Sequence, residues 1–171
     1  MLERIQSLEE FWPYYLSEHR STISRRLHFV GTTGFLASVA ASAITNPIGV
    51  SLAAVGFGVL GKRGLAREKH APSLPHVAAM LGLGTLASPV FFPAGVMAAY
   101  GCAWIGHFGF EKNRPATFHY PLMSLVSDFR MYGRMLRGQL WSGDPLEELG
   151  LEDPRHRVED ATVEPLPSVL N

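Results

Sequence analysis

Three histidines that could bind a metal ion lie at or near the borders of two uncharged stretches of the chain. Residues 29–61 and 71–110 contain no Asp, Glu, Lys or Arg. His28 immediately precedes the first stretch, His107 lies three residues inside the end of the second, and His19 lies upstream of both. An imidazole at the end of an apolar segment needs a polar partner or water, and imidazole nitrogens commonly bind transition metals. The pattern therefore indicates a metal site where apolar segments meet water.

Glu111 is the candidate fourth ligand. It follows His107 by four residues, so on a helix the two side chains would share a face and could reach one ion. His19 lies nine residues before His28, and on one continuous helix these two would point to nearly opposite sides. The chain must therefore turn between them, and we expect that turn at residues 21–24, Ser-Thr-Ile-Ser.

The set of three imidazoles and a carboxylate limits the choice of metal. It suits Fe(II), Zn(II) or Mn(II) better than Ca(II) or Mg(II), which prefer oxygen ligands. Open coordination positions, as in non-haem iron oxygenases, would favour Fe(II). Arg26 and Lys112 lie beside the candidate ligands and could bind a substrate carboxylate. The alternative for both is contact with anionic lipid at a membrane border.

The elements that must position these residues are expected to be four short apolar helices. The first uncharged stretch divides at residues 45–47, Thr-Asn-Pro, and the second divides at residues 88–93, which begin Ser-Pro. We therefore predict two helical hairpins, flanked by an N-terminal helix over residues 7–20 and an amphipathic helix over residues 122–141. Each apolar segment is shorter than the about 20 residues that typically cross a bilayer. Tilted spans, shallow hairpins and a very apolar soluble bundle would all fit that length.

The distribution of charge favours the membrane alternative. All fifteen Lys and Arg lie in the N-terminal segment, in residues 62–69 or after Glu111. With four spans, these regions face one side, as the positive-inside rule requires. We therefore predict an all-α membrane protein with both termini in the cytoplasm. One helical domain, residues 1–141, would carry the metal site, and residues 142–171 would form an acidic mobile tail. The net charge of zero gives no indication of a nucleic-acid partner.

Three segments in order resemble a known family. They are FWPYYLSEHR at residues 11–20, RRLHFVGT at residues 25–32, and WIGHFGFEKNRPATFHYPLMSLVSDFRMY at residues 104–132. Together they are similar to the 2-hydroxy fatty acid dioxygenase-like family of phytosphingosine metabolism to odd-numbered fatty acids, long catalogued as a domain of unknown function. The stretch EKNRPATF at residues 111–118 resembles the bacterial branch of that family, which implies a location in the bacterial inner membrane.

The resemblance implies an Fe(II)-dependent dioxygenase that shortens a 2-hydroxy fatty acid by one carbon with O2 and without 2-oxoglutarate. It implies that His19, His28 and His107 are the catalytic metal ligands, and that Glu111 matches a family carboxylate. Two other classes of function stay open. A non-enzymatic membrane scaffold or lipid-binding protein would not need the histidines to converge, and a zinc-dependent lipid hydrolase would bind zinc and use no oxygen.

Overall fold

The computed structural model describes residues 4–154, and every regular element in that part of the chain is helical. The prediction of an all-α fold is therefore confirmed for the described residues. The elements are α1 (Leu8–Ser17), α2 (Thr22–Thr45), α3 (Pro47–Glu68), α4 (Leu74–Ala87), α5 (Phe91–Trp104), the π-helix η1 (Ile105–Glu111), the 3-10 turn η2 (Ala116–Phe118), α6 (Pro121–Leu136) and α7 (Pro145–Leu149).

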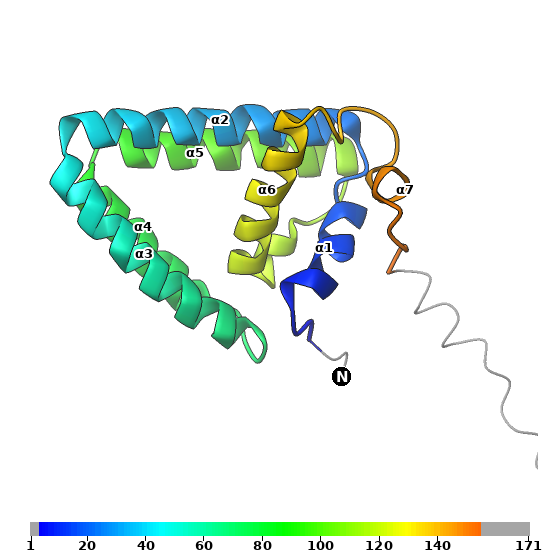
Figure 1. Cartoon of the computed structure of the whole chain (residues 1–171), viewed down its shortest axis with the longest axis horizontal. Coiled ribbons are helices and arrows are strands. Elements are labelled where there is room, and N and C mark those ends of the chain that lie inside the picture. The colour runs from blue at the N-terminus through cyan, green and yellow to red at the C-terminus, as the bar shows by residue number, and fades with distance from the viewer. Residues whose placement is uncertain (1–3, 155–171) are drawn as a thin grey trace, which may run out of the picture.

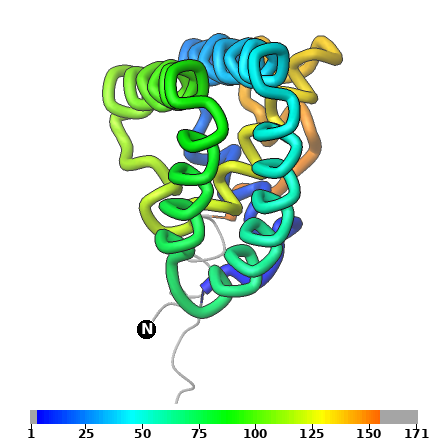
Figure 2. The backbone as a smooth tube through the Cα atoms, turned by 90° about the vertical axis from the view of Figure 1, so that its left-hand side faces the viewer, coloured from blue at the N-terminus to red at the C-terminus, as the bar shows by residue number. Residues whose placement is uncertain are grey.

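Helices α2 to α5 form the two arms of a V (Figure 1). Helix α2 packs along α5 in the upper arm of Figure 1, and α3 packs along α4 in the lower arm. Both chain breaks, at Asn46 and Ser88, lie at the corner where the arms meet, as the side view also shows (Figure 2). The breaks fall where the sequence predicts them, but the pairing differs from the predicted hairpins α2–α3 and α4–α5. Each of those consecutive pairs bends open at the corner instead of folding back.

Contacts at the corner and in the upper arm explain this pairing. The Asn46 side chain accepts a hydrogen bond from the Gly49 N–H, which caps α3, and donates one to the Ala87 carbonyl at the second break. Along the upper arm, Gly31 allows α2 and α5 to approach closely. A Cβ at Gly31 would lie 2.9 Å from the Cβ of Cys102, so any larger residue would push the two helices apart.

Helices α1 and α6 hold the main core. Aromatic residues of α1 pack against methionines of α6, with Phe11, Leu16, Met131 and Met135 almost fully buried. The buried carboxylate of Glu68, at the end of α3, accepts hydrogen bonds from backbone N–H groups of Leu122 and Met123 in the first turn of α6. A carboxylate is favourable at a helix N-terminus. This contact therefore attaches the lower arm to α6.

The chain after residue 141 differs from the predicted mobile tail. Helix α7 packs on α1, with Leu146 only 2% exposed. The buried guanidinium of Arg25 donates hydrogen bonds to the carbonyls of Leu140 and Gly143, because these groups would otherwise lack partners away from water. Helix α7 is therefore packed on the helical domain, and residues 155–171 of the predicted tail lie outside the described residues.

Two of the helices, α2 and α3, are long and apolar enough to cross a membrane, whereas α4 and α5 have 14 residues each. The outer faces of the arms expose large aliphatic side chains. Ile44 and Leu86 near the corner are 83% and 84% exposed. Exposed apolar surface on this scale is typical of a membrane or protein contact, and length and composition together make α2 and α3 candidate membrane spans.

Candidate metal centre

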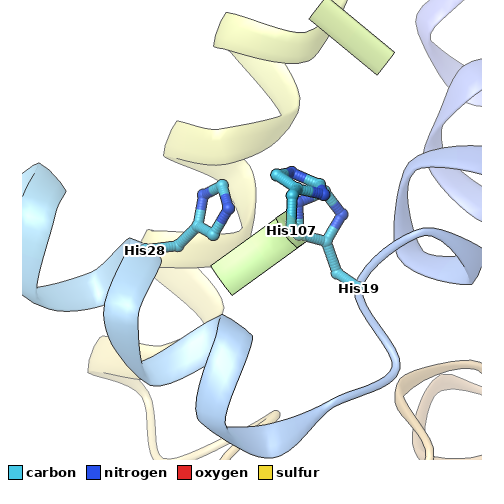
Figure 3. Close-up of side chains that lie close together, drawn as sticks. All are labelled: His19, His28 and His107. Carbon is cyan, nitrogen blue, oxygen red and sulfur yellow. The ribbon is translucent and has the colours of Figure 1, made fainter. Parts of the chain in front are cut away.

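The structure brings His19, His28 and His107 together (Figure 3). One ring nitrogen of each lies within 4.8 Å of a nitrogen of the other two. The ring centroids are 4.7 Å apart for His19 and His28, 4.6 Å for His19 and His107, and 5.3 Å for His28 and His107. All three side chains are buried. A non-enzymatic scaffold would not need these three histidines to converge, so their convergence favours a metal site over that alternative.

A turn between α1 and α2 makes this convergence possible, as the nine-residue spacing requires. Helix α1 ends at Ser17, and α2 begins at Thr22 with Ser21 as its N-cap. Arg25 stabilises the turn, because its guanidinium donates to the carbonyls of His19 at 3.0 Å and Arg20 at 2.7 Å. The predicted turn is present, but it lies at residues 18–21, earlier than expected, because residues 22–24 form the first turn of α2.

His107 reaches the site from the π-helix η1. A π-helix closes i→i+5 hydrogen bonds and is found mostly as single turns, frequently at functional sites. This one ends at Lys112, which has a left-handed backbone with φ of 55°, and the Asn113 N–H then donates to the His107 carbonyl. The chain thus folds back, so that the Asn113 side chain meets the ring of His107.

Each histidine is held through its Nδ1 atom. His19 Nδ1 lies 2.6 Å from the Tyr15 carbonyl, His28 Nδ1 lies 2.6 Å from Oδ1 of Asp128, and His107 Nδ1 lies 2.8 Å from Oδ1 of Asn113. All three partners are oxygen acceptors. The Asn113 amide is oriented by its Nδ2, which donates to the carbonyl and carboxylate of Glu18. Each Nδ1 therefore carries the proton, and in the neutral ring each Nε2 keeps a lone pair.

The Nε2 atoms provide the test of whether these residues fit a metal ion. Among the described residues, Nε2 of His19 and Nε2 of His28 are buried and have no hydrogen-bond partner. Buried polar atoms are almost always paired, so two unpaired nitrogens beside each other call for an explanation. A metal ion bound through Nε2, with Nδ1 donating to an oxygen, is the usual arrangement of a histidine ligand. The three residues fit such an ion.

Burial also keeps the rings of His19 and His107 in the state that a metal requires. Burial lowers the pKa of His19 well below its ordinary value, and the neighbouring His28 and His107 rings lower it further. Burial lowers the pKa of His107 to about 4. Because ligands must be deprotonated to bind a metal, rings that stay neutral well below pH 7 are suited to metal binding.

Asp128 on α6 is the functional candidate that sequence reasoning missed. Besides His28, its carboxylate accepts hydrogen bonds from the Thr32 hydroxyl at 2.6 Å and the Tyr15 hydroxyl at 3.2 Å. Burial, and then the charge of Asp128, raises the pKa of Tyr15 well above its ordinary value, so the phenol keeps its proton. One carboxylate thereby joins α1, α2 and α6. One feature of the sequence could have indicated its importance: Asp128 is the only acidic residue of α6.

Glu111 does not join the histidine group. Its carboxylate accepts a hydrogen bond from the Ser21 N–H at 2.9 Å, at the N-terminus of α2. Burial raises the pKa of Glu111, although this hydrogen bond acts in the opposite direction. The structure therefore gives Glu111 the role of a cap on α2, in place of the fourth ligand that the His-x3-Glu spacing predicts.

The two predicted carboxylate-binding residues also lie away from the histidines. Arg26 is exposed and donates to the Trp141 carbonyl at 3.1 Å, and Lys112 is exposed at the end of η1. Neither lines the cavity that contains the histidines. That cavity has a volume of about 80 Å³ and is polar where Tyr15, Asp128 and the three rings line it. Its remaining wall is mainly apolar and includes Ala99, Tyr100, Trp104, Pro121 and Leu125.

Comparison with known proteins places the same segments in a described family. Residues 5–140 match the model of the family described as 2-hydroxy-palmitic acid dioxygenase Mpo1-like. The matched range contains the three histidines, Asn113 and Asp128, and it excludes α7. No curated protein and no solved structure matches the chain.

Proposed function

The chain belongs to the 2-hydroxy-palmitic acid dioxygenase Mpo1-like family, and we propose that it uses one Fe(II) ion and O2 to shorten a 2-hydroxy fatty acid by one carbon. The observation that supports this proposal best is the pair of buried, unpaired Nε2 atoms of His19 and His28 beside the ring of His107. Three imidazoles leave coordination positions open for substrate and oxygen, as non-haem iron oxygenases require.

The proposed reaction balances without 2-oxoglutarate. A 2-hydroxy acid, R–CH(OH)–COOH, and one O2 yield R–COOH, CO2 and H2O. The bond between C1 and C2 breaks, C1 leaves as CO2, and C2 becomes the new carboxyl carbon. The substrate supplies all four electrons that reduce O2, so no second organic reductant is needed. When bound to His19, His28 and His107, the ion would supply a redox-active Lewis acid next to the substrate.

The residues of the chain contribute orientation and a dry site. Asp128, the Tyr15 carbonyl and Asn113 each hold one Nδ1–H, so the three rings are fixed before an ion binds. Tyr15, with its raised pKa, keeps its hydroxyl proton and donates a hydrogen bond to Asp128. The apolar wall of the cavity, including Trp104 and Leu125, excludes water and favours an acyl chain.

We also propose that the corner of the V enters the inner membrane and that both termini lie in the cytoplasm. The corner end of the arms is uncharged, and the basic residues lie toward the open ends, in the segment before α2, at residues 62–69 and after Glu111. This distribution follows the positive-inside rule. The substrate's acyl chain would then reach the histidines from the bilayer.

Oxygen uptake by anaerobically purified protein tests the proposal. The protein is loaded with Fe(II), supplied with 2-hydroxypalmitate, and the product is identified by mass spectrometry. We expect uptake only with both additions, a product one carbon shorter, and one atom of 18O from 18O2 in its carboxyl group. Zn(II)-loaded protein serves as a control and should take up no oxygen. A shortened product formed equally with Zn(II), which has no redox chemistry, would contradict the proposed iron-dependent reaction.

A further inference from the structure

The corner of the V contains a second cavity that the histidine site does not explain. It has a volume of about 180 Å³ and is lined by residues of α2, α3, α4 and α5, which meet there (Figures 1 and 2). Its surface exposes no polar atom, because the hydroxyls of Ser42 and Ser88 hydrogen bond to each other at 2.8 Å. An empty apolar cavity loses van der Waals contacts along its walls, and such cavities bind apolar ligands.

The two cavities follow one another along one face of α2. His28 and Thr32 line the histidine cavity, and Phe35, Val39 and Ser42 line the corner cavity. Their spacing of four, three, four and three residues marks a single helix face. The two cavities therefore lie on the same face of α2, the corner cavity being the nearer to the corner of the V.

The junction between the two cavities is aromatic. The ring of Phe35 lies 5.9 Å from that of Phe92 on α5 and 6.3 Å from that of Phe129 on α6. On the other side of the corner cavity, Phe57 of α3 contacts Phe92, with ring centroids 5.8 Å apart. An acyl chain that ran from the histidines to the corner along this face of α2 would therefore pass aromatic side chains.

The distances along α2 suit a long acyl chain. With a rise of about 1.5 Å per residue, Phe35 lies about 10 Å and Ser42 about 21 Å along the helix from His28. The second distance is comparable to the length of an extended sixteen-carbon chain. A ten-carbon chain bound at the histidines would end near Phe35, short of most of the corner cavity.

We propose that the corner cavity binds the methyl end of the substrate's acyl chain and thereby sets the preferred chain length. This inference rests on the proposed function, because the histidine site anchors the polar end of the same molecule. Each methylene group that enters the cavity is removed from water, which favours binding by up to about fourfold per group. Chains that stop before the cavity lack this contribution.

Chain-length profiles of designed variants test the proposal. Protein in lipid nanodiscs is given 2-hydroxy acids of ten to eighteen carbons, and kcat/KM is compared. Ala53 is buried in α3 and lines the cavity, so Ala53→Leu should fill part of it. We expect kcat/KM to fall by at least about tenfold for the sixteen-carbon acid and to change little for the ten-carbon acid. Phe57→Ala enlarges the cavity and should shift the optimum toward eighteen carbons.

A matched control is Ala40→Leu, the same substitution at an exposed position of α2 that lines neither cavity. Its profile should follow that of the wild type. Equal losses at all chain lengths in Ala53→Leu, or unchanged profiles in both cavity variants, would overturn the proposal. The second result would mean that the cavity holds a bilayer lipid tail instead of the substrate.

A binding measurement separates this proposal from the proposed reaction. Fatty acids without the 2-hydroxy group, decanoic and hexadecanoic acid, are titrated into the metal-free protein while the shift in thermal unfolding is recorded. Hexadecanoic acid should stabilise the wild type more than Ala53→Leu, whereas decanoic acid should not distinguish them. If this holds without oxygen uptake, the cavity assignment stands and the reaction fails. If the protein turns over the substrate but neither the chain-length profile nor the thermal shift depends on Ala53 or Phe57, the reaction stands and the cavity assignment fails.

Discussion

Asp128 accepts a hydrogen bond from Nδ1 of His28 at 2.6 Å, across 100 positions of the sequence. The contact orients the ring so that its Nε2 points into the histidine group, and a carboxylate in this position also makes the ring a stronger ligand. Asp128 is thus a positioning residue for the proposed metal centre. It depends on the packing of α6 against α2, which no local pattern in either helix reveals.

Replacing Asp128 with Asn should weaken metal binding without unfolding the protein. The amide is neutral and supports the His28 Nδ1–H less strongly, so we expect Fe(II) affinity to fall by about 10–100-fold. Competition with a chelator of known affinity measures this. Glu147→Gln, which alters an exposed carboxylate of α7, is the control and should retain wild-type affinity. Equal affinities for wild type and Asp128→Asn would remove Asp128 from the site.

Replacing His28 or His107 with Ala should abolish metal binding, because each change removes one of three ligands. The bound metal should fall from one ion per chain to none by elemental analysis. The helical content in circular dichroism should stay the same, since neither ring belongs to the hydrophobic core cluster of the described residues. His70 is exposed and lies outside the group, so His70→Ala should bind metal normally. A full complement of metal in His107→Ala would place the site elsewhere.

Replacing Glu111 with Ala should lower stability and leave the metal content unchanged. Its carboxylate caps α2 through the Ser21 N–H and is not part of the histidine group. Loss of a cap costs about 1 kcal/mol, which chemical denaturation of the metal-free protein can detect. If Glu111→Ala instead loses its metal at unchanged stability, the sequence-based prediction of a carboxylate ligand is correct.

Replacing Glu68 with Ala should be strongly destabilising. Its buried carboxylate accepts hydrogen bonds from two N–H groups of α6, and both would lose their partner. We expect a loss of about 2–4 kcal/mol in the free energy of unfolding. Glu9→Ala changes an exposed carboxylate in α1 and should cost far less. Similar losses in the two variants would show that Glu68 does not attach the lower arm to α6.

The metal-free protein should lose stability as the pH falls from about 6.5 toward 4. The pKa of His107 is about 4 in the folded chain and about 6.5 in an unfolded one. Between these values the unfolded state binds the proton and the folded state does not, so acid favours unfolding. The contribution is fully present above pH 6.5 and amounts to at most about 3 kcal/mol.

Denaturation of wild type and His107→Asn at pH 7 and pH 5 measures this difference. The variant lacks the titrating ring, so its loss of stability between the two values should be smaller than that of the wild type. An identical loss in both proteins would assign the pH dependence to other groups.

Local patterns in the sequence were sufficient for the helical fold, the chain breaks and the histidines. Turn residues act on their own neighbours, so Asn46 and Ser88 mark the breaks without reference to the rest of the chain. Histidines beside apolar segments stand out because an imidazole there needs a partner. The nine-residue spacing of His19 and His28 further required a turn, and the structure has one. The family resemblance rested on the same segments.

Only the tertiary structure decided how the helices pair and what surrounds the histidines. The apolar stretches of the four helices, residues 29–61 and 71–110, carry no charge. Sequence alone therefore does not say whether α2 packs on α3 or on α5. That choice depends on close approach at Gly31 and on the Asn46 contact with the second break. The role of Glu111 as a cap and of Asp128 as the partner of His28 follows from the same packing. Both are contacts between residues about ninety or more positions apart, which periodicity and local spacing cannot reveal.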